Sequence, residues 1–313
     1  MLFPRALQPM ELNMPSTLEE FSNQLANAVQ QAGQSVISIL EGGRAGVSGT
    51  VWREGVGVAV DHTIQGLDEV TIILPSGKET KAAVAGRDPG TDIAILKLPI
   101  DIQAAALADD ANARAGEIVL SVGRRGTEGV AVAYGLISAI GGAWRTSSGG
   151  RIDRWLRLDL SPFPGFSGGP IINASCEVLG IANSGPGRSA AVVPTTSVNR
   201  VVDQLLKHGH TVRGYIGVGV QPVAFPEDAW QKLGITGGRG LLIIAMAPGS
   251  SAMEAGLMLG DVIVAIEGKS LQTGASLQSI LDAENVGKSV NLDLVRGGQL
   301  LKIAVTVRER PAS

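Results

Sequence analysis

Between Val36 and Val193 the chain alternates short apolar runs with turn-forming residues, and this rhythm limits its fold more than any other feature. Turn signals such as Pro75-Ser76-Gly77 and Asp88-Pro89-Gly90 separate the runs. Strands this short, at such intervals, predict an antiparallel sandwich or barrel. The predicted strands are 36–40, 46–52, 56–60, 70–74, 82–85, 93–98, 118–122, 130–140, 155–160, 171–173, 178–182 and 190–193.

A chain of 313 residues is expected to form about two domains, since ~150 residues per domain is usual. The first clear helix after the N-terminal region is predicted at 196–208, and the polar stretch 209–213 follows it. The helix end and the glycine beyond it favour a domain boundary here. We therefore predict a flexible tail over 1–17, a first domain over 18–210 and a second over 211–313.

The second domain shows a fresh pattern of about a hundred residues, which is enough for an independent core. Both strand and helix periods occur, so an α+β fold is expected. The predicted strands are 215–220, 240–246, 261–266, 289–296 and 300–308, and the predicted helices are 251–255 and 277–284.

A helix is also predicted over 18–32, at the start of the first domain. Ser16 or Thr17 can cap it, and Glu19 and Glu20 would lie in its first turn, where carboxylates favour the positive helix end. Apolar residues recur at helical spacing in Phe21, Leu25, Ala28 and Val29. We interpret it as a packing helix in preference to an oligomer contact.

Charge and cysteine content exclude several classes of protein. A formal net charge of -3 gives no electrostatic case for a nucleic-acid partner or an anionic membrane surface. Cys176 is the single cysteine, so no intrachain disulfide can form. The segment 1–14 lacks an apolar run of signal-peptide length, and no later run reaches the ~20 residues of a membrane span. The chain as it stands is expected to be cytoplasmic, or periplasmic if a leader was removed.

A serine between glycines stands in the segment Gly165-Phe166-Ser167-Gly168-Gly169-Pro170. Glycine has no Cβ, so it lets the backbone bend sharply, direct N–H groups to one point and admit a substrate. A serine that attacks an acyl carbon needs such donors for the oxyanion and a base beside it. Ser167 is therefore a candidate nucleophile.

The chain offers three histidines as the base. His208 and His210 close a helix, where an imidazole near the negative helix end is usually structural. His62 follows an apolar strand, and Asp92 enters another, where a carboxylate needs a partner. The order His62, Asp92, Ser167 is that of base, acid and nucleophile in chymotrypsin-like proteases.

An alternative is the nucleophile elbow of α/β-hydrolases, which Gly165 to Gly169 also fits. That fold requires a helix directly after the serine, with the acid and the histidine following, and Asp203 and His208 could formally supply them. However, the residues after Pro170 are predicted as a strand, and Asp203 and His208 share one helix. We therefore reject this interpretation.

Five motifs, at matching intervals, resemble the HtrA (Deg) serine proteases, and the resemblance covers about residues 35–310. They are Ser48-Gly49-Thr50-Val51-Trp52, Asp61-His62-Thr63-Ile64, Thr91-Asp92-Ile93-Ala94-Ile95-Leu96-Lys97, Pro164-Gly165-Phe166-Ser167-Gly168-Gly169-Pro170 and Val193-Pro194. The resemblance implies a mostly β fold, a chymotrypsin-like double β-barrel followed by a PDZ domain. It also implies His62 as general base, Asp92 as its orienter, Ser167 as nucleophile, and the N–H groups of Gly165 and Ser167 as the oxyanion hole.

Three segments depart from the family pattern. Phe166 stands where the family usually has Asn, and only its backbone is expected to matter to the loop. Asp61 stands where the family usually has Asn or an Ala-like residue, which puts an extra carboxylate next to His62 in the sequence. The segment 121–126, Ser-Val-Gly-Arg-Arg-Gly, lacks the usual Asn-Pro-Phe-Gly. None of these departures removes a catalytic group.

Cleavage preference follows from the residues before the serine. In trypsin an acid at the pocket floor stands a few residues before the nucleophile; Ser161 takes that place here, followed by Pro162 and Phe163. A floor without charge disfavours Lys and Arg, and the resemblance implies cleavage after small or medium aliphatic residues. We expect Ala182, Asn183 and Ser184 to form part of the pocket wall.

The last hundred residues contain the segments Tyr215-Ile216-Gly217-Val218, Ala247-Pro248-Gly249-Ser250-Ser251-Ala252, Ala255-Gly256-Leu257 and Gly260-Asp261-Val262-Ile263. These segments resemble the PDZ module of the same family. Such modules take a peptide as an added strand and bind its C-terminal carboxylate in a nest of backbone N–H groups. That loop would be formed by Tyr215, Ile216, Gly217 and Val218, and Ser276 and Leu277 would form the facing wall.

These features together predict a serine endopeptidase that cleaves unfolded or misfolded proteins and binds peptide C-termini through its PDZ domain. No metal or cofactor is expected, and the resemblance implies a homo-oligomer, a trimer formed through the N-terminal segment. The alternative is a peptide-binding, chaperone-like protein whose protease domain is held in a resting state.

Overall fold

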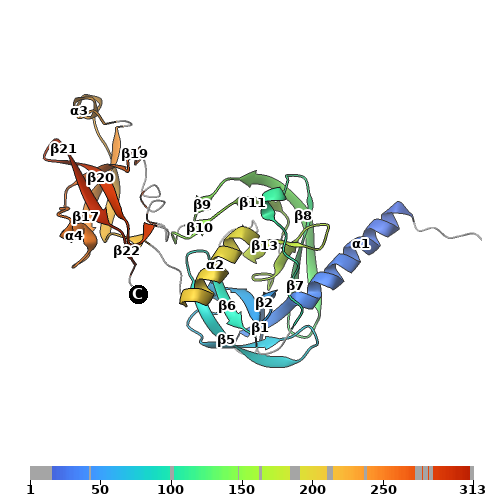
Figure 1. Cartoon of the computed structure of the whole chain (residues 1–313). Coiled ribbons are helices and arrows are strands. Elements are labelled where there is room, and N and C mark those ends of the chain that lie inside the picture. The colour runs from blue at the N-terminus through green and yellow to red at the C-terminus, as the bar shows by residue number, and fades with distance from the viewer. Residues whose placement is uncertain are drawn as a thin grey trace, which may run out of the picture. The chain divides into compact units, whose positions relative to one another are not determined.

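The computed structural model describes residues 16–41, 44–98, 102–146, 148–161, 164–183, 191–209, 214–235, 238–271, 277, 281 and 285–310 (Figure 1). The chain divides into two compact units, residues 1–144 with 152–200, and residues 145–151 with 201–313. This division falls inside a helix, ten residues before the predicted boundary at 210/211. The boundary remains a prediction, because residues 210–213 lie outside the described chain.

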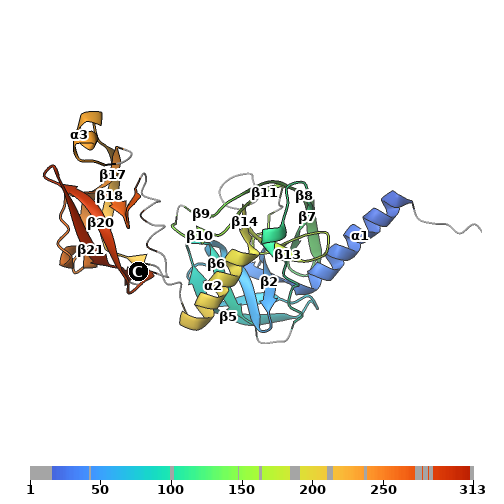
Figure 2. The same ribbon diagram turned by 45° about the horizontal axis from the view of Figure 1, so that its top comes forward.

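The first unit contains two closed antiparallel β-barrels, which confirms the predicted fold class (Figure 2). The first barrel has the strand order β1-β2-β3-β6-β5-β4. Its core is aliphatic and includes Ile37, Ile39, Ile72 and Leu96. Its strands are β1 Val36–Glu41, β2 Arg44–Arg53, β3 Val56–Val60, β4 Glu69–Ile73, β5 Glu79–Asp88 and β6 Ile93–Lys97.

The second barrel has the order β11-β14-β13-β12-β7-β8. Its core gathers Val119, Ile137, Ile171 and Leu179 around the ring of Phe166. Its strands are β7 Ile118–Arg124, β8 Val130–Gly141, β11 Trp155–Asp159, β12 Pro170–Ile172, β13 Val178–Asn183 and β14 Ala191–Pro194. Between β8 and β11 the short strands β9 Trp144–Arg145 and β10 Arg151–Ile152 pair with each other.

Helix α1 runs from Thr17 to Ala32, and the 3-10 helix η1, Gly33–Ser35, joins it to β1. The Ser16 side chain accepts a hydrogen bond from the Glu19 N–H at 3.2 Å, so Ser16 is the cap. Of its residues, Ala28 and Ala32 are buried, whereas Phe21 is 39% exposed. The packing-helix interpretation is therefore wrong for the N-terminal half of α1, because these residues meet no barrel surface.

Helix α2, Thr195–His208, follows the second barrel, and Asp110 caps its first turn by accepting from Thr196 N at 2.7 Å. Its valines and Leu205 are buried as the helical period predicts. Leu206, next to Leu205 on the same helix, is 50% exposed.

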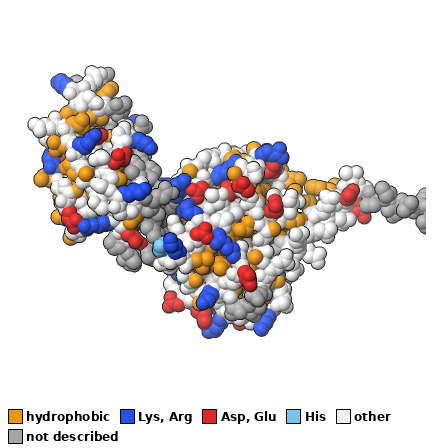
Figure 3. All heavy atoms as spheres, viewed as in Figure 1, with side chains coloured by type: hydrophobic (Ala, Val, Ile, Leu, Met, Phe, Trp, Pro, Cys, Tyr) orange, Lys and Arg blue, Asp and Glu red, His pale blue; other side chains and the backbone are white. Residues whose placement is uncertain are grey.

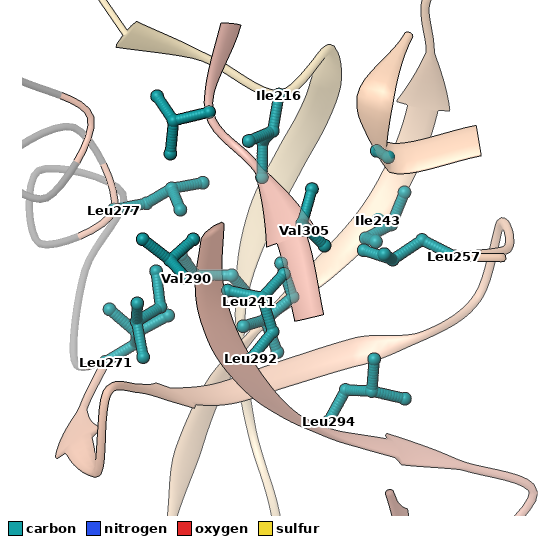
Figure 4. Close-up of a cluster of buried hydrophobic side chains, with 14 residues drawn as sticks. Ile216, Leu241, Ile243, Leu257, Leu271, Leu277, Val290, Leu292, Leu294 and Val305 are labelled. Atoms are coloured by element: carbon teal, nitrogen blue, oxygen red, sulfur yellow. The ribbon is translucent and has the colours of Figure 1, made fainter. Parts of the chain in front are cut away.

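The second unit contains a sheet of order β16-β17-β18-β20-β21, in which β16 forms one edge. Its core is shown in Figure 4, where Leu241, Leu292 and Val305 meet from different strands. Asp261 anchors the turn before β18 through Arg296. Burial opposes ionisation of Asp261, but the hydrogen bonds from Arg296 and the Met258 N–H outweigh it, and the pKa of Asp261 is lowered.

The elements of this unit include one short helix that the sequence did not predict, α3. The strands are β15 Gly214–Tyr215, β16 Val218–Ala224, β17 Arg239–Met246, β18 Val262–Ile266, β19 Lys269–Ser270, β20 Ser289–Arg296, β21 Gln299–Thr306 and β22 Arg308–Glu309, and the helices are α3 Glu227–Lys232 and α4 Ser251–Glu254. The predicted helix at 277–284 lies almost wholly outside the described residues.

Acidic and basic side chains are interspersed on the face of the first unit that Figure 3 shows. Among the described residues, no helix combines the length and the apolar composition that a membrane crossing needs.

Candidate active site

His62 and Asp92 meet because two paired strands place them side by side. β3 and β6 are antiparallel with Val60 opposite Ile93, so the residues after β3 lie beside the residue before β6. The Asp61 N–H donates to the Asp92 carbonyl at 3.1 Å and extends this pairing. His62 sits in the 3-10 helix η2, Asp61–Thr63, directly after β3.

The Asp92 carboxylate holds His62 at two points. One oxygen, Oδ2, lies 2.6 Å from His62 Nδ1, and the other, Oδ1, accepts the His62 backbone N–H at 2.8 Å. An ionised carboxylate only accepts hydrogen bonds, so the ring proton belongs on Nδ1 and Nε2 is left as a proton acceptor. The imidazole is half exposed, with 50% of its side-chain surface accessible. This tautomer is the one that a general base needs.

The backbone of Asp92 has φ +61°, which is uncommon for a residue other than glycine. Aspartate tolerates this region better than most residues, because its short side chain can bond locally. Here the carboxylate bonds both the backbone and the ring of His62. The strained backbone is thus located at the residue that orients the imidazole.

Asn183 is a partner of Asp92 that the sequence did not reveal. Its Nδ2 donates to Asp92 Oδ2 at 3.0 Å, from the last residue of β13. Asn183 and Asp92 are 91 residues apart, and no motif linked them. The predicted role of Asn183 in a pocket wall remains a prediction, but its amide nitrogen faces the acid.

Asp61 stands next to His62 in the sequence, but its carboxylate belongs to a different contact. It is 4% exposed and lies 2.7 Å from Arg87 Nη1. Arg87 also donates to the carbonyl groups of Ile64 and Leu67. Asp61 therefore holds the segment after η2 in place.

The turn around Ser167 is held between the two barrels. Gly165 and Gly168 have φ of +95° and +86°, in the region that favours glycine. From the first barrel, Ser48 N donates to the Ser167 carbonyl at 3.0 Å, and Thr50 Oγ1 donates to the Gly168 carbonyl at 2.9 Å. From the second barrel, the Ala182 carbonyl accepts the Gly168 N–H at 2.8 Å.

These contacts bring the Ser167 turn to the strands that carry His62 and Asp92. A Cβ added to Gly168 would lie 3.6 Å from the Cα of Ala59, on the strand that leads to His62. Ala182, which binds Gly168, immediately precedes Asn183, the partner of Asp92. Ser167 itself is 4% exposed.

Gly165 is half buried, and no acceptor among the described residues takes its N–H. Its carbonyl points elsewhere and accepts from Ser48 Oγ at 2.7 Å. An N–H without a protein acceptor, beside the serine, is what an oxyanion donor requires.

The segment after Ser167 decides against the α/β-hydrolase alternative. Strand β12 begins at Pro170, where that fold requires a helix. Asp203 and His208 both lie on α2.

Comparisons with known proteins agree with this geometry. Residues 47–181 match the trypsin-like peptidase domain, and residues 214–307 match the PDZ domain. The "Serine protease Do-like HtrA" of Lactobacillus helveticus is 34% identical over 272 residues, which cover 80% of this chain and 66% of the relative. The chain belongs to the HtrA family of serine proteases.

Other relatives are similar over most of this chain. The "Probable periplasmic serine endoprotease DegP-like" of Brucella suis is 32% identical over 268 residues, 83% of this chain and 51% of that protein. The chain thus spans about half the length of the DegP-like relatives it matches. The solved structure "HtrA-type protease AlgW with tripeptide" has a TM-score of 0.73 at 26% identity, covering 92% of this chain and 98% of that one. A serine endoprotease from Yersinia pestis, at 23% identity and TM-score 0.73, shares the fold.

The HtrA pattern usually has Asn where this chain has Phe166, and the expectation that only its backbone matters is wrong. The ring is fully buried in the core of the second barrel. A Cβ on Gly123 would lie 2.4 Å from the ring, so glycine at 123 makes room for it. The side chain beside the nucleophile is therefore a core residue.

Replacing Phe166 by alanine is expected to lower the free energy of unfolding by about 3–5 kcal/mol, because the change removes a buried ring and leaves a cavity. Thermal or urea unfolding of the full chain measures this. The control is Tyr134→Ala, whose side chain is 54% exposed and which should change stability far less. Equal losses in both variants would contradict the core role of Phe166.

The predicted specificity pocket is described only in part. Ser161 is exposed, Ala182 is buried and Asn183 is half buried. Pro162, Phe163 and Ser184 lie outside the described residues.

In the PDZ domain, the predicted carboxylate loop joins β15 to β16. Ile216 is buried in the core together with Leu277, and both point inward in Figure 4. Gly217 has φ +82°, and a Cβ there would lie 2.2 Å from Ser250 Cβ. Val218 begins the edge strand β16, Tyr215 ends β15, and Ser276 lies outside the described residues.

Proposed function

We propose that this chain is a serine endopeptidase that hydrolyses unfolded polypeptides through an acyl-enzyme on Ser167. The observation that supports the proposal is the 2.6 Å contact between His62 Nδ1 and the Asp92 carboxylate, at the end of the strand β3 against which the turn after Ser167 packs. Fold alone would not support an activity, because one fold hosts many functions. A base with a defined tautomer beside a serine turn is a site with a specific chemistry.

In the proposed reaction, these residues act in two half-reactions. Ser167 Oγ attacks the scissile carbonyl carbon while His62 Nε2 takes the hydroxyl proton, and Asp92 stabilises the imidazolium. The N–H groups of Gly165 and Ser167 stabilise the oxyanion. His62 then protonates the leaving amine and the C–N bond breaks. In the second half, His62 takes a proton from water as the water attacks the ester; the acyl C–Oγ bond then breaks, His62 returns the proton to Ser167 Oγ, and the carboxylic acid is released.

Ser161 at the pocket floor gives no carboxylate to bind Lys or Arg at the cleavage position. We therefore propose cleavage after small or medium aliphatic residues, with Ala182 and Asn183 in the wall. A digest mapped by mass spectrometry would overturn this if most cuts followed basic residues.

A digest of an unfolded protein such as reduced casein tests the activity. The wild-type chain should cleave it, with or without added C-terminal peptides, and Ser167→Ala prepared in parallel should not. If neither protein cleaves under either condition, the peptidase proposal fails and the result favours the chaperone-like alternative. Equal cleavage by both would assign the activity to a contaminant.

The PDZ domain offers β16 as an edge strand, which can accept a peptide as a further strand. We expect a peptide that ends in a free-carboxylate valine to bind, because backbone N–H groups of 215–218 can bind the charge. Calorimetry on the full chain carrying Ser167→Ala measures this. Amidating the peptide should weaken binding by about 10-fold or more, since hydrogen bonds to charged groups contribute ~1.5–3 kcal/mol. Unchanged affinity would contradict carboxylate capture.

We also propose that the chain forms a homotrimer through α1. Leu18 and Phe21 are 76% and 39% exposed on a helix whose end alone is buried. Sedimentation of the double variant Leu18→Glu/Phe21→Glu should show monomers where the wild type is trimeric. The control is Leu206→Glu, at an exposed leucine of α2, which should remain trimeric. A monomeric wild type would contradict the proposal.

A further inference from the structure

Arg124, at the end of β7, is an almost buried cation held by backbone carbonyls. It is 8% exposed; Nε donates to the Val36 carbonyl at 2.7 Å, and Nη2 donates to the Gly33 carbonyl at 2.8 Å. Among the described residues no carboxylate forms an ion pair with it, and burial lowers the pKa of the guanidinium. Burying a charge is costly unless it is hydrogen-bonded, and the two carbonyls supply the hydrogen bonds that offset this cost.

The two carbonyls belong to the junction between α1 and β1. Gly33 begins η1, and Val36 begins β1. In Figure 1 and Figure 2 the C-terminal end of α1 lies beside β7 and β8. Arg124 therefore ties the end of the helix to the end of β7.

The backbone of Arg124 continues this contact toward the active site. Its N–H donates to Ser48 Oγ at 2.9 Å, and Ser48 Oγ donates to the Gly165 carbonyl at 2.7 Å. Ser48 N binds the Ser167 carbonyl as well, at 3.0 Å. One fully buried serine thus holds the peptide groups on both sides of the Phe166–Ser167 bond.

An outside contact is needed at this point because Gly165 limits its own backbone little. Glycine adopts positive and negative φ with similar ease, so the peptide that follows Gly165 can rotate at small cost. The hydrogen bond from Ser48 Oγ fixes the position of the Gly165 carbonyl, at a residue whose φ is +95°. The Arg125 side chain adds a packing contact, since a Cβ on Gly165 would lie 3.0 Å from its carbons.

We propose that Ser48 and Arg124 are positioning residues that make the shape of the oxyanion loop depend on the α1–β1 junction. This inference rests on the proposed peptidase function, and it deepens that function by naming what holds Gly165. Neither side chain touches the substrate or takes a proton. Their effect is on the transition state, because a loop displaced by about 1 Å can cost about 10²-fold in rate.

The test compares Ser48→Ala with Ser197→Ala. Ser197 is matched because it is also fully buried, accepts a backbone N–H (Asp153, 2.8 Å) and donates to an oxygen of the same residue at 3.1 Å. Ser48→Ala is expected to lower kcat for a fluorogenic peptide about 10²-fold with KM within about 3-fold. Its affinity for a peptide boronate should fall in parallel. Ser197→Ala should keep kcat within about 2-fold of wild type, although its thermal stability should fall about as much as that of Ser48→Ala.

Arg124→Lys tests the second link, because a single ammonium cannot reproduce the guanidinium bonds to two carbonyls. In a double-mutant cycle with Ser48→Ala, the combined loss of kcat should not exceed the larger single loss. Additive losses, or a kcat for Ser48→Ala within 2-fold of wild type, would overturn the proposal.

Hydrogen exchange gives a readout that does not need activity. Amides over 165–169 should exchange faster in Ser48→Ala and in Arg124→Lys, and at the wild-type rate in Ser197→Ala. Unchanged exchange in the first two variants would overturn the positioning role. An inactive wild-type chain with the expected exchange pattern would instead count against the peptidase function alone.

Discussion

Asp92→Asn is expected to lower kcat for peptide hydrolysis by about 10⁴-fold while the fold is retained. The asparagine keeps the size of the side chain. Its amide group, however, has a single oxygen, so it cannot accept hydrogen bonds from the His62 backbone N–H, from His62 Nδ1 and from Asn183 as the carboxylate does. If its NH₂ group faces Nδ1, the ring proton moves to Nε2, and His62 can no longer take the Ser167 proton. Steady-state kinetics on a fluorogenic peptide measures the loss.

The matched control is Asp68→Asn, an exposed aspartate of the same barrel. It removes the same charge from the protein without touching His62, so kcat should stay within about 2-fold of wild type. A kcat for Asp92→Asn within 10-fold of wild type would contradict the role of Asp92 as orienter, provided that circular dichroism shows the fold intact.

Gly168→Ala is expected to abolish most activity and to destabilise the first unit. The added Cβ would lie 2.1 Å from the Ser48 carbonyl oxygen, and φ at this position is +86°. The left-handed backbone costs an L-residue about 1–2 kcal/mol and the steric conflict about 1–3 kcal/mol more. We therefore expect a loss of about 2–5 kcal/mol in unfolding free energy and about 10²-fold or more in kcat/KM.

The control for Gly168→Ala separates the free-energy cost of a left-handed backbone from the cost of the steric conflict. Gly129 has φ +96°, and no atom lies within 4 Å of an added Cβ. Gly129→Ala should cost only the backbone term, about 1–2 kcal/mol, with kcat/KM little changed. Similar losses of kcat/KM in both variants would contradict the close fit of the Ser167 turn against β2.

Local sequence patterns predicted the strands well, because the spacing of apolar residues and the position of turn residues are local properties of the sequence. Strands β3, Val56–Val60, and β20, Ser289–Arg296, begin and end where the apolar pattern does. Helix α1 shows the limit, since its period predicted an apolar face but could not reveal that the barrels end before reaching Phe21.

The candidate site was predictable where a motif carries its own chemistry, as in the segments around His62, Asp92 and Ser167. The contacts that hold these residues were not predictable. Asn183 reaches Asp92 across 91 residues, and Ser48 reaches Gly165 across 117. Such pairs depend on how two barrels pack together, which a single sequence does not encode in any local pattern. Phe166 was misjudged for the same reason, because its pocket depends on Gly123.

The central claim is that Ser167 is a nucleophile activated by His62. Labelling with a fluorophosphonate, followed by mass spectrometry of the digested chain, tests this most directly. We expect one adduct, on Ser167, formed in the wild type with or without a C-terminal peptide and nearly absent in His62→Ala, whose serine is intact but has no base. An adduct on another residue, no adduct on Ser167 under either condition, or labelling that persists at the wild-type rate in His62→Ala would contradict the claim.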